Sequence, residues 1–448
     1  MARKTDTDMT RGVIWKLLVQ FSVPMMIGLL FQQLYNTVDA MVVGRFCSTE
    51  ALAAVSCNGN IINVLVGTFA GLATGASVVI SQAYGSHDDE RLSKAVHTTA
   101  AITLILCVAG TVIGILTANP LLALTKPDPA VVEDAQLYLK IYFAGLTGLL
   151  IYNVGSGVLR AVGDSTRPVY FLIVSAVTNT ILDIVFVVWF DMGVAGVAWA
   201  TVIAELVSAL LVIYVLVRAK AAYGIRVSKI RIDRPLFKQI LALGLPSAIQ
   251  TGITSFSNVF VQSYINSFNA AGMAAWGIYN KLDAFVCLPM QALSMASSTF
   301  VGQNWGAGLI KRAKEGVSSA VKLSLIITAS LAVIAILFKT PLLRIFSDDA
   351  DVLDYGRYFI NIITPFYVII LFNNIYSGAL RGIGDAKTPT VIMLLSFVAF
   401  RQLYLFTFCK LLGFEGNRLV ISLAYPVGWI MCSTLINIYY RKSALCKN

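Results

Sequence analysis

Four polar side chains lie inside stretches that are otherwise apolar, and their types are those that bind small cations. They are Asp39, Asn179, Asp183 and Thr201. Asn179 and Asp183 are four residues apart, so they share one face if the segment is helical. Carboxylate, amide and hydroxyl oxygens suit a hard cation such as Na⁺. Two nearby buried carboxylates repel each other when both are ionised, which favours proton uptake. The residues predict a site for Na⁺ or H⁺.

Two further polar residues extend this predicted site. Asn36 lies three residues before Asp39, and Glu205 lies four residues after Thr201 on the same predicted helix face. A charged side chain at the centre of a membrane costs at least about 2.5–3.5 kcal/mol, so such residues usually face a cavity or a partner. The alternative is a structural polar cluster that ties three helices together.

The composition predicts a membrane protein. Of 448 residues, 57% are hydrophobic and 13% are charged, and the mean hydropathy is +0.77. Soluble domains carry about 25% charged residues. Many apolar stretches approach the ~20 residues that a spanning helix needs, and helices satisfy their backbone within lipid. The chain is therefore predicted to be all-α and polytopic. Twelve spans are expected, at 14–43, 51–80, 96–118, 136–159, 168–190, 193–217, 237–267, 272–299, 317–338, 356–380, 389–412 and 419–440.

An internal repeat divides these spans into two sets of six. The segment Gly157–Pro168 returns as Gly378–Pro389, 221 residues later (378 − 157 = 221). Gly163 and Gly384 in these segments suit a helix C-terminus, where a positive φ is favoured. An even number of spans per copy makes the repeat parallel, with two pseudo-symmetric six-helix bundles. The predicted division is 1–217 for the first lobe, 218–236 for a cytoplasmic linker and 237–448 for the second lobe.

The distribution of basic residues predicts the orientation. Most of the 34 Lys and Arg residues fall on the cytoplasmic side if both termini are cytoplasmic. The net charge of +11 then requires no nucleic acid, because anionic lipid faces the same side. The basic stretch 218–238 is expected to be a solvated linker rather than a lipid-binding helix. His87 and His97 are expected at the surface rather than in a metal site.

Several helix-shaping residues stand out in the predicted spans. Gly67, Gly71 and Gly75 are four apart and allow another helix to approach closely. Pro24 and Pro246 occupy corresponding places in spans one and seven, where each can bend its helix.

The second repeat differs from the first at the polar positions. Asp183 corresponds to Tyr404 (183 + 221 = 404), and Asn179 corresponds to Phe400. The second repeat instead carries Asp283 and Arg401 within its spans, and we expect these two to form a neutralising ion pair.

Together these motifs resemble the multidrug and toxic compound extrusion (MATE) family, most closely its DinF-like branch. The resemblance rests on Asn36–Arg45, the twin Leu-Arg-x-x-Gly-Asp loops and Asn179-x-x-x-Asp183. It implies two six-helix bundles around a central cavity and export of organic, often cationic, compounds against Na⁺ or H⁺. It also implies a first-lobe cation site at Asp39, Asn179, Asp183 and Thr201. Residues suggested for the substrate cavity are Met25, Met26, Asn153, Met273, Trp276, Asp283, Met290 and Arg401.

The predicted function is a cation-coupled multidrug efflux antiporter that works by alternating access. The alternative is a lipid-linked oligosaccharide flippase of the same broad superfamily. No HExxH, GxSxG or Walker pattern occurs, so we expect no enzyme. We expect no cofactor, no metal beyond Na⁺ at the coupling site, and no nucleic-acid partner. The protein is expected to be a monomer in the plasma (inner) membrane.

Overall fold

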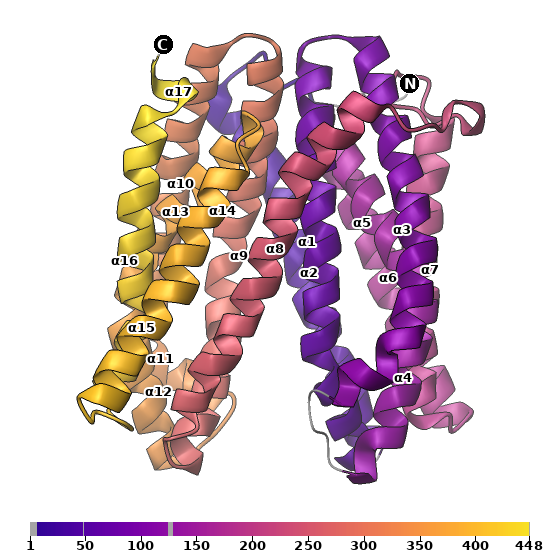
Figure 1. Cartoon of the computed structure of the whole chain (residues 1–448). Coiled ribbons are helices and arrows are strands. Elements are labelled where there is room, and N and C mark those ends of the chain that lie inside the picture. The colour runs from indigo at the N-terminus through magenta and orange to yellow at the C-terminus, as the bar shows by residue number, and fades with distance from the viewer. Residues whose placement is uncertain (1–6, 48, 124–128, 448) are drawn as a thin grey trace. The chain divides into compact units, whose positions relative to one another are not determined.

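The fold is helical throughout the part of the chain that the structure describes. The computed structural model covers residues 7–47, 49–123 and 129–447. At some helical positions, Asn36 and Asp39 among them, it describes the backbone alone. Every regular element within these residues is a helix, and none of them forms a strand (Figure 1). The all-α prediction from composition is confirmed.

The number of membrane spans agrees with the sequence. Eleven described helices are long and apolar enough to cross a membrane, and one bent pair of helices brings the total to twelve. This pair is Pro129–Ala144 with Leu146–Ala161, and its two parts meet at 48°. The bend comes at Gly145, where a Cβ atom would lie 2.2 Å from Cγ2 of Val202. The close approach of Val202 therefore requires a residue without a side chain at the bend.

One compact unit contains residues 1–8 and 23–248. Its elements are α1 (Ile14–Phe46, from Val23 onward), α2 (Thr49–Gly85), α3 (Asp89–Ala123), η1 (Pro129–Val131), α4 (Val132–Ala144), α5 (Leu146–Ala161), α6 (Thr166–Ile184), η2 (Val185–Trp189), α7 (Gly193–Arg218), η3 (Val227–Lys229) and the first part of α8 (Arg234–Ile265). Its buried core includes Leu139, Leu146 and Val197, contributed by three different helices. Apolar burial between helices thus holds α4, α5 and α7 together.

The other compact unit contains residues 9–22 and 249–448. Its remaining elements are α9 (Ala270–Gly306), α10 (Ile310–Leu337), α11 (Lys339–Arg344), α12 (Ala350–Ile363), η4 (Thr364–Phe366), α13 (Tyr367–Gly382), α14 (Lys387–Leu394), η5 (Leu395–Phe400), α15 (Arg401–Leu405), η6 (Phe406–Leu411), α16 (Arg418–Lys442) and α17 (Ala444–Lys447). Its core includes Phe359, Leu405 and Ile421. Aromatic rings, including Trp276 and Tyr367, give this core much of its volume.

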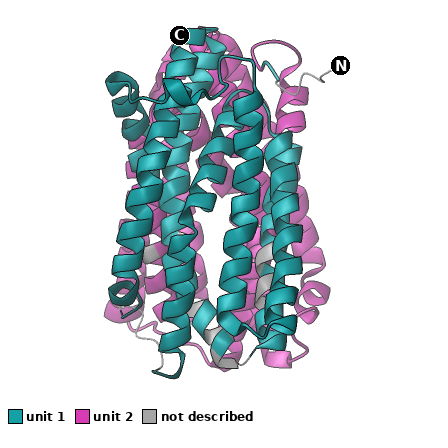
Figure 2. Ribbon diagram, turned by 90° about the vertical axis from the view of Figure 1, so that its right-hand side faces the viewer, with its two compact units in different colours: residues 1–8, 23–248 teal, residues 9–22, 249–448 magenta. Residues whose placement is uncertain are grey.

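Two long helices each contribute residues to both units. The unit boundary falls between residues 22 and 23 in α1 and between residues 248 and 249 in α8 (Figure 2). Pro24 and Pro246 lie within a few residues of these two boundaries, inside continuous helices. Each proline removes one backbone hydrogen bond at the place where its helix changes unit. The division at 1–217, 218–236 and 237–448 follows the order of the repeats and stays a prediction.

Glycines allow α2 and α8 to approach closely within the first unit. A Cβ on Gly71 would lie 2.4 Å from the amide nitrogen of Ala248. A Cβ on Gly75 would lie 2.4 Å from the amide nitrogen of Gly244. The neighbours are backbone atoms, which cannot move aside as a flexible side chain can. The predicted tight helix packing is confirmed at Gly71 and Gly75.

The twin loops have the same geometry in both repeats. Gly163 has a φ of 93° and Gly384 has a φ of 97°, as their place after a helix predicts. The amide of Asp164 donates to the carbonyl of Leu159, and the amide of Asp385 donates to that of Leu380, each at 2.9 Å. These identical closures confirm that the two copies share one local fold.

The aspartates of these loops organise the start of the following helix. Oδ1 of Asp164 accepts hydrogen bonds from the amides of Thr166 and Arg167, at 3.1 and 3.0 Å. Oδ1 of Asp385 accepts one from the amide of Thr388 at 3.1 Å. Side-chain oxygens at such positions satisfy amides that a helix leaves unbonded at its N-terminus. The repeated Gly-Asp pair therefore joins two helices by a tight loop.

The helices that follow these loops contain π-helical segments. In the first repeat η2 begins at Val185, and in the second η6 begins at Phe406, which is the corresponding position (185 + 221 = 406). A further π-helical segment, η5, occurs in the second repeat at Leu395–Phe400. Such segments are rare and are frequent at functional sites. Both repeats thus have altered helix geometry beside the polar positions that the sequence singled out.

The basic stretch after α7 is folded against α3. The carbonyl of Ser93 lies 2.7 Å from Nδ1 of His97, and the amide of Arg226 donates to Nε2 of the same ring at 3.0 Å. The hydroxyl of Thr98 accepts from the amide of Asp233 at 3.1 Å. The surface prediction for His97 is wrong, because its side chain is 3% exposed and joins two segments. His87 is exposed, as expected.

Replacing His97 by Phe should loosen this stretch, because the ring would keep its bulk and lose its acceptor for the Arg226 amide. We expect faster hydrogen–deuterium exchange across residues 224–233 than in the unaltered protein. His87→Phe is the matched control, since that side chain is exposed, and it should leave the exchange unchanged. Equal protection of the stretch in both variants would contradict a clamping role for His97.

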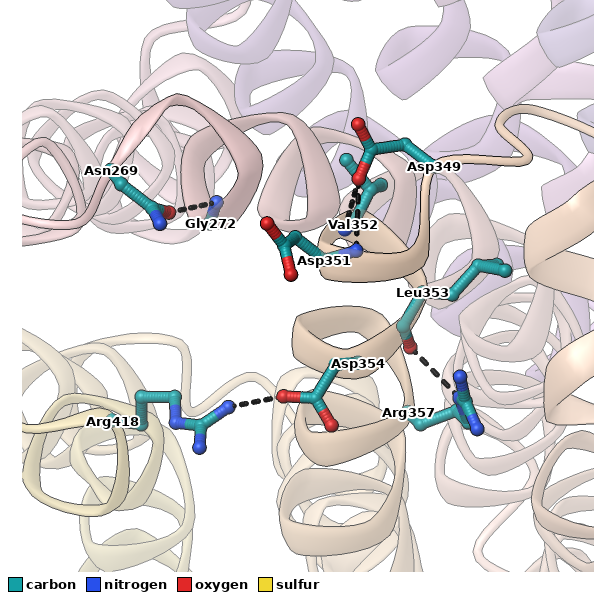
Figure 3. Close-up of polar contacts among 9 residues, drawn as sticks. All are labelled: Asn269, Gly272, Asp349, Asp351, Val352, Leu353, Asp354, Arg357 and Arg418. Atoms are coloured by element: carbon teal, nitrogen blue, oxygen red, sulfur yellow. Dashed lines mark hydrogen bonds and ion pairs between the residues drawn. The ribbon is translucent and has the colours of Figure 1, made fainter.

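Polar contacts also fix the helix ends at one end of the second unit (Figure 3). The side chain of Asn269 accepts from the amide of Gly272 and begins α9. Asp349 accepts from the amides of Asp351 and Val352 and begins α12. Nη1 of Arg418 lies 2.7 Å from Oδ2 of Asp354, which pairs α16 with α12. Arg418 is thus a half-buried arginine with a carboxylate partner.

Candidate cation site

Two neighbouring helices of the first unit carry the described part of the predicted site. Asn179 and Asp183 lie on α6, and Thr201 lies on α7. Their exposed fractions are 0%, 0% and 3%, so all three side chains are enclosed. The hydroxyl of Ser175 donates to the carbonyl of Ala204 at 2.7 Å and holds the two helices together one turn away. Sequence spacing and helix packing together bring these residues to one place.

The hydrogen bonds within the cluster leave an oxygen for a ligand. Thr201 Oγ1 donates to the carbonyl of Val197 at 3.0 Å, and Asn179 Nδ2 donates to Thr201 Oγ1 at 3.5 Å. These bonds orient Asn179 so that Nδ2 faces α7. Its buried Oδ1 has no hydrogen-bond partner among the described residues. A buried amide oxygen of this kind can coordinate a cation or accept a hydrogen bond from a protonated group.

Asp183 lies just before the π-helical segment of its helix. α6 ends at Ile184, and η2 begins at Val185. A π-turn changes the direction of the side chains and carbonyls beside it. The buried carboxylate therefore sits where the helix geometry changes, as polar sites in membrane helices often do.

The carboxylate of Asp183 also acts on the chain segment just after α1. Burial raises the pKa of the Cys47 thiol, and the negative charges of Asp191, Asp134 and Asp183 raise it further. Asn36 and Asp39 themselves fall outside the residues whose side chains the structure describes. Their membership of the site stays a prediction.

The remaining predicted site residues occupy different environments. Glu205 is half-buried, one turn along α7 from Thr201, and a Cβ on Gly148 of α5 would approach its Cβ to 3.2 Å. Of the predicted substrate-cavity residues, the buried ones are Met25, Trp276, Met290 and Arg401. The half-buried ones are Met26, Asn153 and Asp283, and Met273 is exposed. Asn153 donates to the carbonyl of Leu149 at 2.9 Å in its own helix.

The predicted ion pair between Arg401 and Asp283 is wrong. Nη2 of Arg401 donates to Ser257 Oγ at 2.9 Å and to Asn258 Oδ1 at 2.8 Å. Asp283 instead accepts a hydrogen bond from the hydroxyl of Tyr367. Each charged group therefore has neutral partners, and sequence alone offers no means of choosing between neutral and charged partners.

Sequence reasoning missed the tyrosines around Asp283. The hydroxyls of Tyr279 and Tyr367 are 2.9 Å apart, and Tyr367 also bonds the carboxylate. Trp276 stacks beside Tyr279 with ring centroids 5.3 Å apart. Tyr279 follows Trp276 by three residues on α9, but nothing in the sequence links either of them to Tyr367 on α13.

The geometry of the described residues does not indicate a metal site built from His, Cys, Asp or Glu side chains. Within the described ranges, no group of three or more His, Cys, Asp or Glu side chains is placed to hold a metal ion. Amide, hydroxyl and carboxylate oxygens in α6 and α7 form the arrangement with the clearest cation-binding chemistry.

Comparison with known proteins agrees with the repeat. The MatE family model matches residues 24–185 and again residues 246–403. The two matches begin at Pro24 and Pro246 and cover both copies of the unit that the sequence repeat defines.

Two similar proteins come from Bacillus subtilis (strain 168). The probable multidrug resistance protein YpnP is 28% identical over 97% of this chain and 96% of its own length. The probable multidrug resistance protein YoeA is 29% identical over 96% of this chain and 94% of its own length. Both alignments run through the two repeats.

A solved structure shows the same fold. The crystal structure of MATE in complex with MaL6 aligns with a TM-score of 0.92 and 23% identity, covering 100% of both chains. The similarity extends over all the helices that carry the polar cluster.

Proposed function

Because the chain belongs to the MatE family of membrane transporters, we propose that it is a multidrug efflux carrier driven by entry of H⁺ or Na⁺. The full-length similarity to two probable multidrug resistance proteins supports export of organic compounds. Transporters of this family are not enzymes, and the absence of a catalytic motif in the sequence is consistent with that. We propose organic cations as the main substrates.

The complete burial of Asp183 inside a spanning helix is the observation that supports ion coupling most strongly. An ionised carboxylate there is unfavourable unless a cation, a proton or a polar partner compensates it. Asn179 offers a buried oxygen beside it, and Thr201 fixes the amide. We assign the coupling site to these three residues with Asp39, and Asn36 and Glu205 are proposed as additional members.

The proposed mechanism is antiport by alternating access. Binding of H⁺ or Na⁺ neutralises the acidic cluster and changes the polar contacts between the helices that carry it. Only a difference in ion affinity between two conformations can shift the balance between them. α1 and α8, which change unit beside Pro24 and Pro246, are the helices that we propose to repack.

The proposal also covers location and assembly. We propose a monomer in the plasma (inner) membrane with both termini cytoplasmic. The lobes would comprise residues 1–217 and 237–448, and residues 218–236 would link them. No cofactor is needed beyond the coupling ion.

Efflux from proteoliposomes under separately imposed Na⁺ and pH gradients tests this function. A panel of cationic and neutral dyes should include compounds whose movement accelerates under one gradient and stops when an ionophore dissipates it. Dye movement that is the same with and without either gradient would contradict ion coupling. Translocation of a lipid-linked oligosaccharide without dye transport would favour the flippase alternative.

A further inference from the structure

Arg401 is a buried cation whose hydrogen-bonding capacity is largely unused. Its side chain is 4% exposed, and it lies at the first residue of α15, directly after the π-helical segment η5. None of the ion pairs in the described residues involves it. Its charge is therefore not neutralised by a carboxylate from the described chain.

The guanidinium group has neutral neighbours on one edge only. Both of its hydrogen bonds start from Nη2, to Ser257 and Asn258 of α8. The buried Nε has no partner among the described residues, and Nη1 donates to none of them. A guanidinium group has five N–H donors, so about three of them have no acceptor among the described residues. The Nε donor is buried, which makes its lack of a partner unfavourable, and an anion would satisfy it.

An aromatic ring completes the surroundings of the guanidinium group. Its Cζ lies 5.0 Å from the ring centroid of Tyr425. That ring lies 5.4 Å from the ring of Trp276 and 6.2 Å from the ring of Trp429. A cation over aromatic rings is held in place without being neutralised. Tyr425 is half-buried, and its ring offers apolar surface for the body of an organic molecule whose anionic group reaches Arg401.

α8 has a polar face that reaches this position. Thr251, Ser255, Asn258 and Gln262 recur at helical spacing on one face, and three of them are exposed. A spanning helix rarely presents such a face to lipid, so this face indicates a hydrated route. Asn258 is exposed and bonds the buried Arg401 directly. It lies seven residues before the end of α8, roughly 10 Å along the helix. This position is deeper in the membrane than the level of the lipid headgroups.

The repeat gives this location a counterpart of opposite charge. Ser257 and Asn258 correspond to Asn36 and Thr37 (36 + 221 = 257; 37 + 221 = 258), and Arg401 corresponds to Thr180 (180 + 221 = 401). The first repeat places Asp183 in this region, where the second has Tyr404. The two copies thus carry charges of opposite sign in this region, at positions three residues apart in the repeat (404 − 401 = 3).

We propose that Arg401, with Ser257 and Asn258, binds the carboxylate or phosphate group of a soluble organic substrate within the second repeat. This inference rests on the proposed function, since it assigns a substrate class to the exporter. The proposed substrates then include compounds that carry an anionic group beside an aromatic or cationic part, in addition to simple organic cations.

Equilibrium binding in nanodiscs of neutral lipid tests the proposal without any ion gradient. The probes are benzoate and phenyl phosphate, with benzyl alcohol and inorganic phosphate as matched controls, and tryptophan fluorescence reports binding. The unaltered protein should bind the two aromatic anions and not the alcohol. Arg401→Gln should weaken that binding about tenfold or more, because the bonds lost involve a charged group. Arg418→Gln, which removes an arginine that already pairs with Asp354, should leave it unchanged.

A second variant keeps the test decisive if Arg401→Gln does not fold. Asn258→Asp places a carboxylate where Oδ1 already lies 2.8 Å from Nη2, so the arginine is neutralised from within. This variant should fold and lose anion binding. Aromatic anions bound equally by both variants and the unaltered protein would overturn the proposal, as would binding of inorganic phosphate alone. Loss of ion-driven efflux with normal anion binding would refute the proposed coupling and leave this inference intact.

Discussion

Replacing Asp183 by Asn should reduce ion-driven export to the background of protein-free liposomes. The substitution keeps the size of the side chain and removes the group that a proton or Na⁺ neutralises. Asn179 and Thr201 would remain in place, because their mutual hydrogen bond does not involve the carboxylate. Substrate binding at equilibrium should persist, since the change affects coupling rather than the substrate surface. Dye efflux under an imposed gradient, with binding measured in parallel, separates the two effects.

Asp191 provides the matched control for this variant. It is exposed, and its φ of 50° lies in the left-handed region, where Asn is equally well tolerated. Asp191→Asn should therefore transport like the unaltered protein. Undiminished efflux by Asp183→Asn would show that this carboxylate does not couple the ion to export. Asp39→Asn extends the test to the predicted partner on α1.

Placing a methyl group on Gly75 should destabilise the fold by about 1–3 kcal/mol, as overpacking of a close contact does. The added Cβ would lie 2.4 Å from the amide nitrogen of Gly244 and 2.5 Å from the carbonyl oxygen of Ile240. Both are backbone atoms of α8, so one of the two helices must shift. Gly71→Ala should behave similarly against Ala248. Thermal unfolding of the purified protein, followed by intrinsic fluorescence, measures the change.

Gly59→Ala serves as the control on the same helix. A Cβ there meets nothing within 4 Å, so the substitution should be neutral or slightly stabilising through helix propensity. An unfolding temperature for Gly75→Ala equal to that of Gly59→Ala would show that the close approach of α2 and α8 is not part of the stable fold.

The sequence predicted the fold well because lipid imposes simple rules. Apolar length and the need to satisfy every backbone group specify helices, and the 221-residue repeat specifies two equal sets of them. The bend at Gly145 and the π-helical segments were not predicted. They depend on contacts such as that with Val202, which is distant in sequence from Gly145.

The candidate site was predictable only where its residues are close together in the sequence. Asn179 and Asp183 share a helix face through their spacing alone, and α7 follows α6 closely enough to supply Thr201. Partners from distant helices were not predictable in this way. Arg401 bonds α8, 143 residues earlier in the chain, and Asp283 bonds Tyr367, 84 residues later. Opposite charges in one repeat suggested an ion pair, but tertiary packing gives both groups neutral partners.

His97 illustrates a different limit of sequence reasoning. A histidine near a loop is usually exposed, yet this one is enclosed because the basic stretch after α7 returns to cover it. Nothing in the local sequence predicts that this stretch packs over His97. The two ring nitrogens are used by Ser93 on one side and Arg226 on the other.

Substrate-induced ion movement is the most direct measurement of the central claim, that a buried acidic cluster couples ion entry to export. Proteoliposomes without any imposed gradient would receive a transported dye, and Na⁺ and pH indicators would follow the ion. We predict that dye movement drives one of these ions in the opposite direction, and that Asp183→Asn abolishes the ion signal. Dye transport with no accompanying ion movement, or an ion signal that is unchanged in Asp183→Asn, would contradict the account.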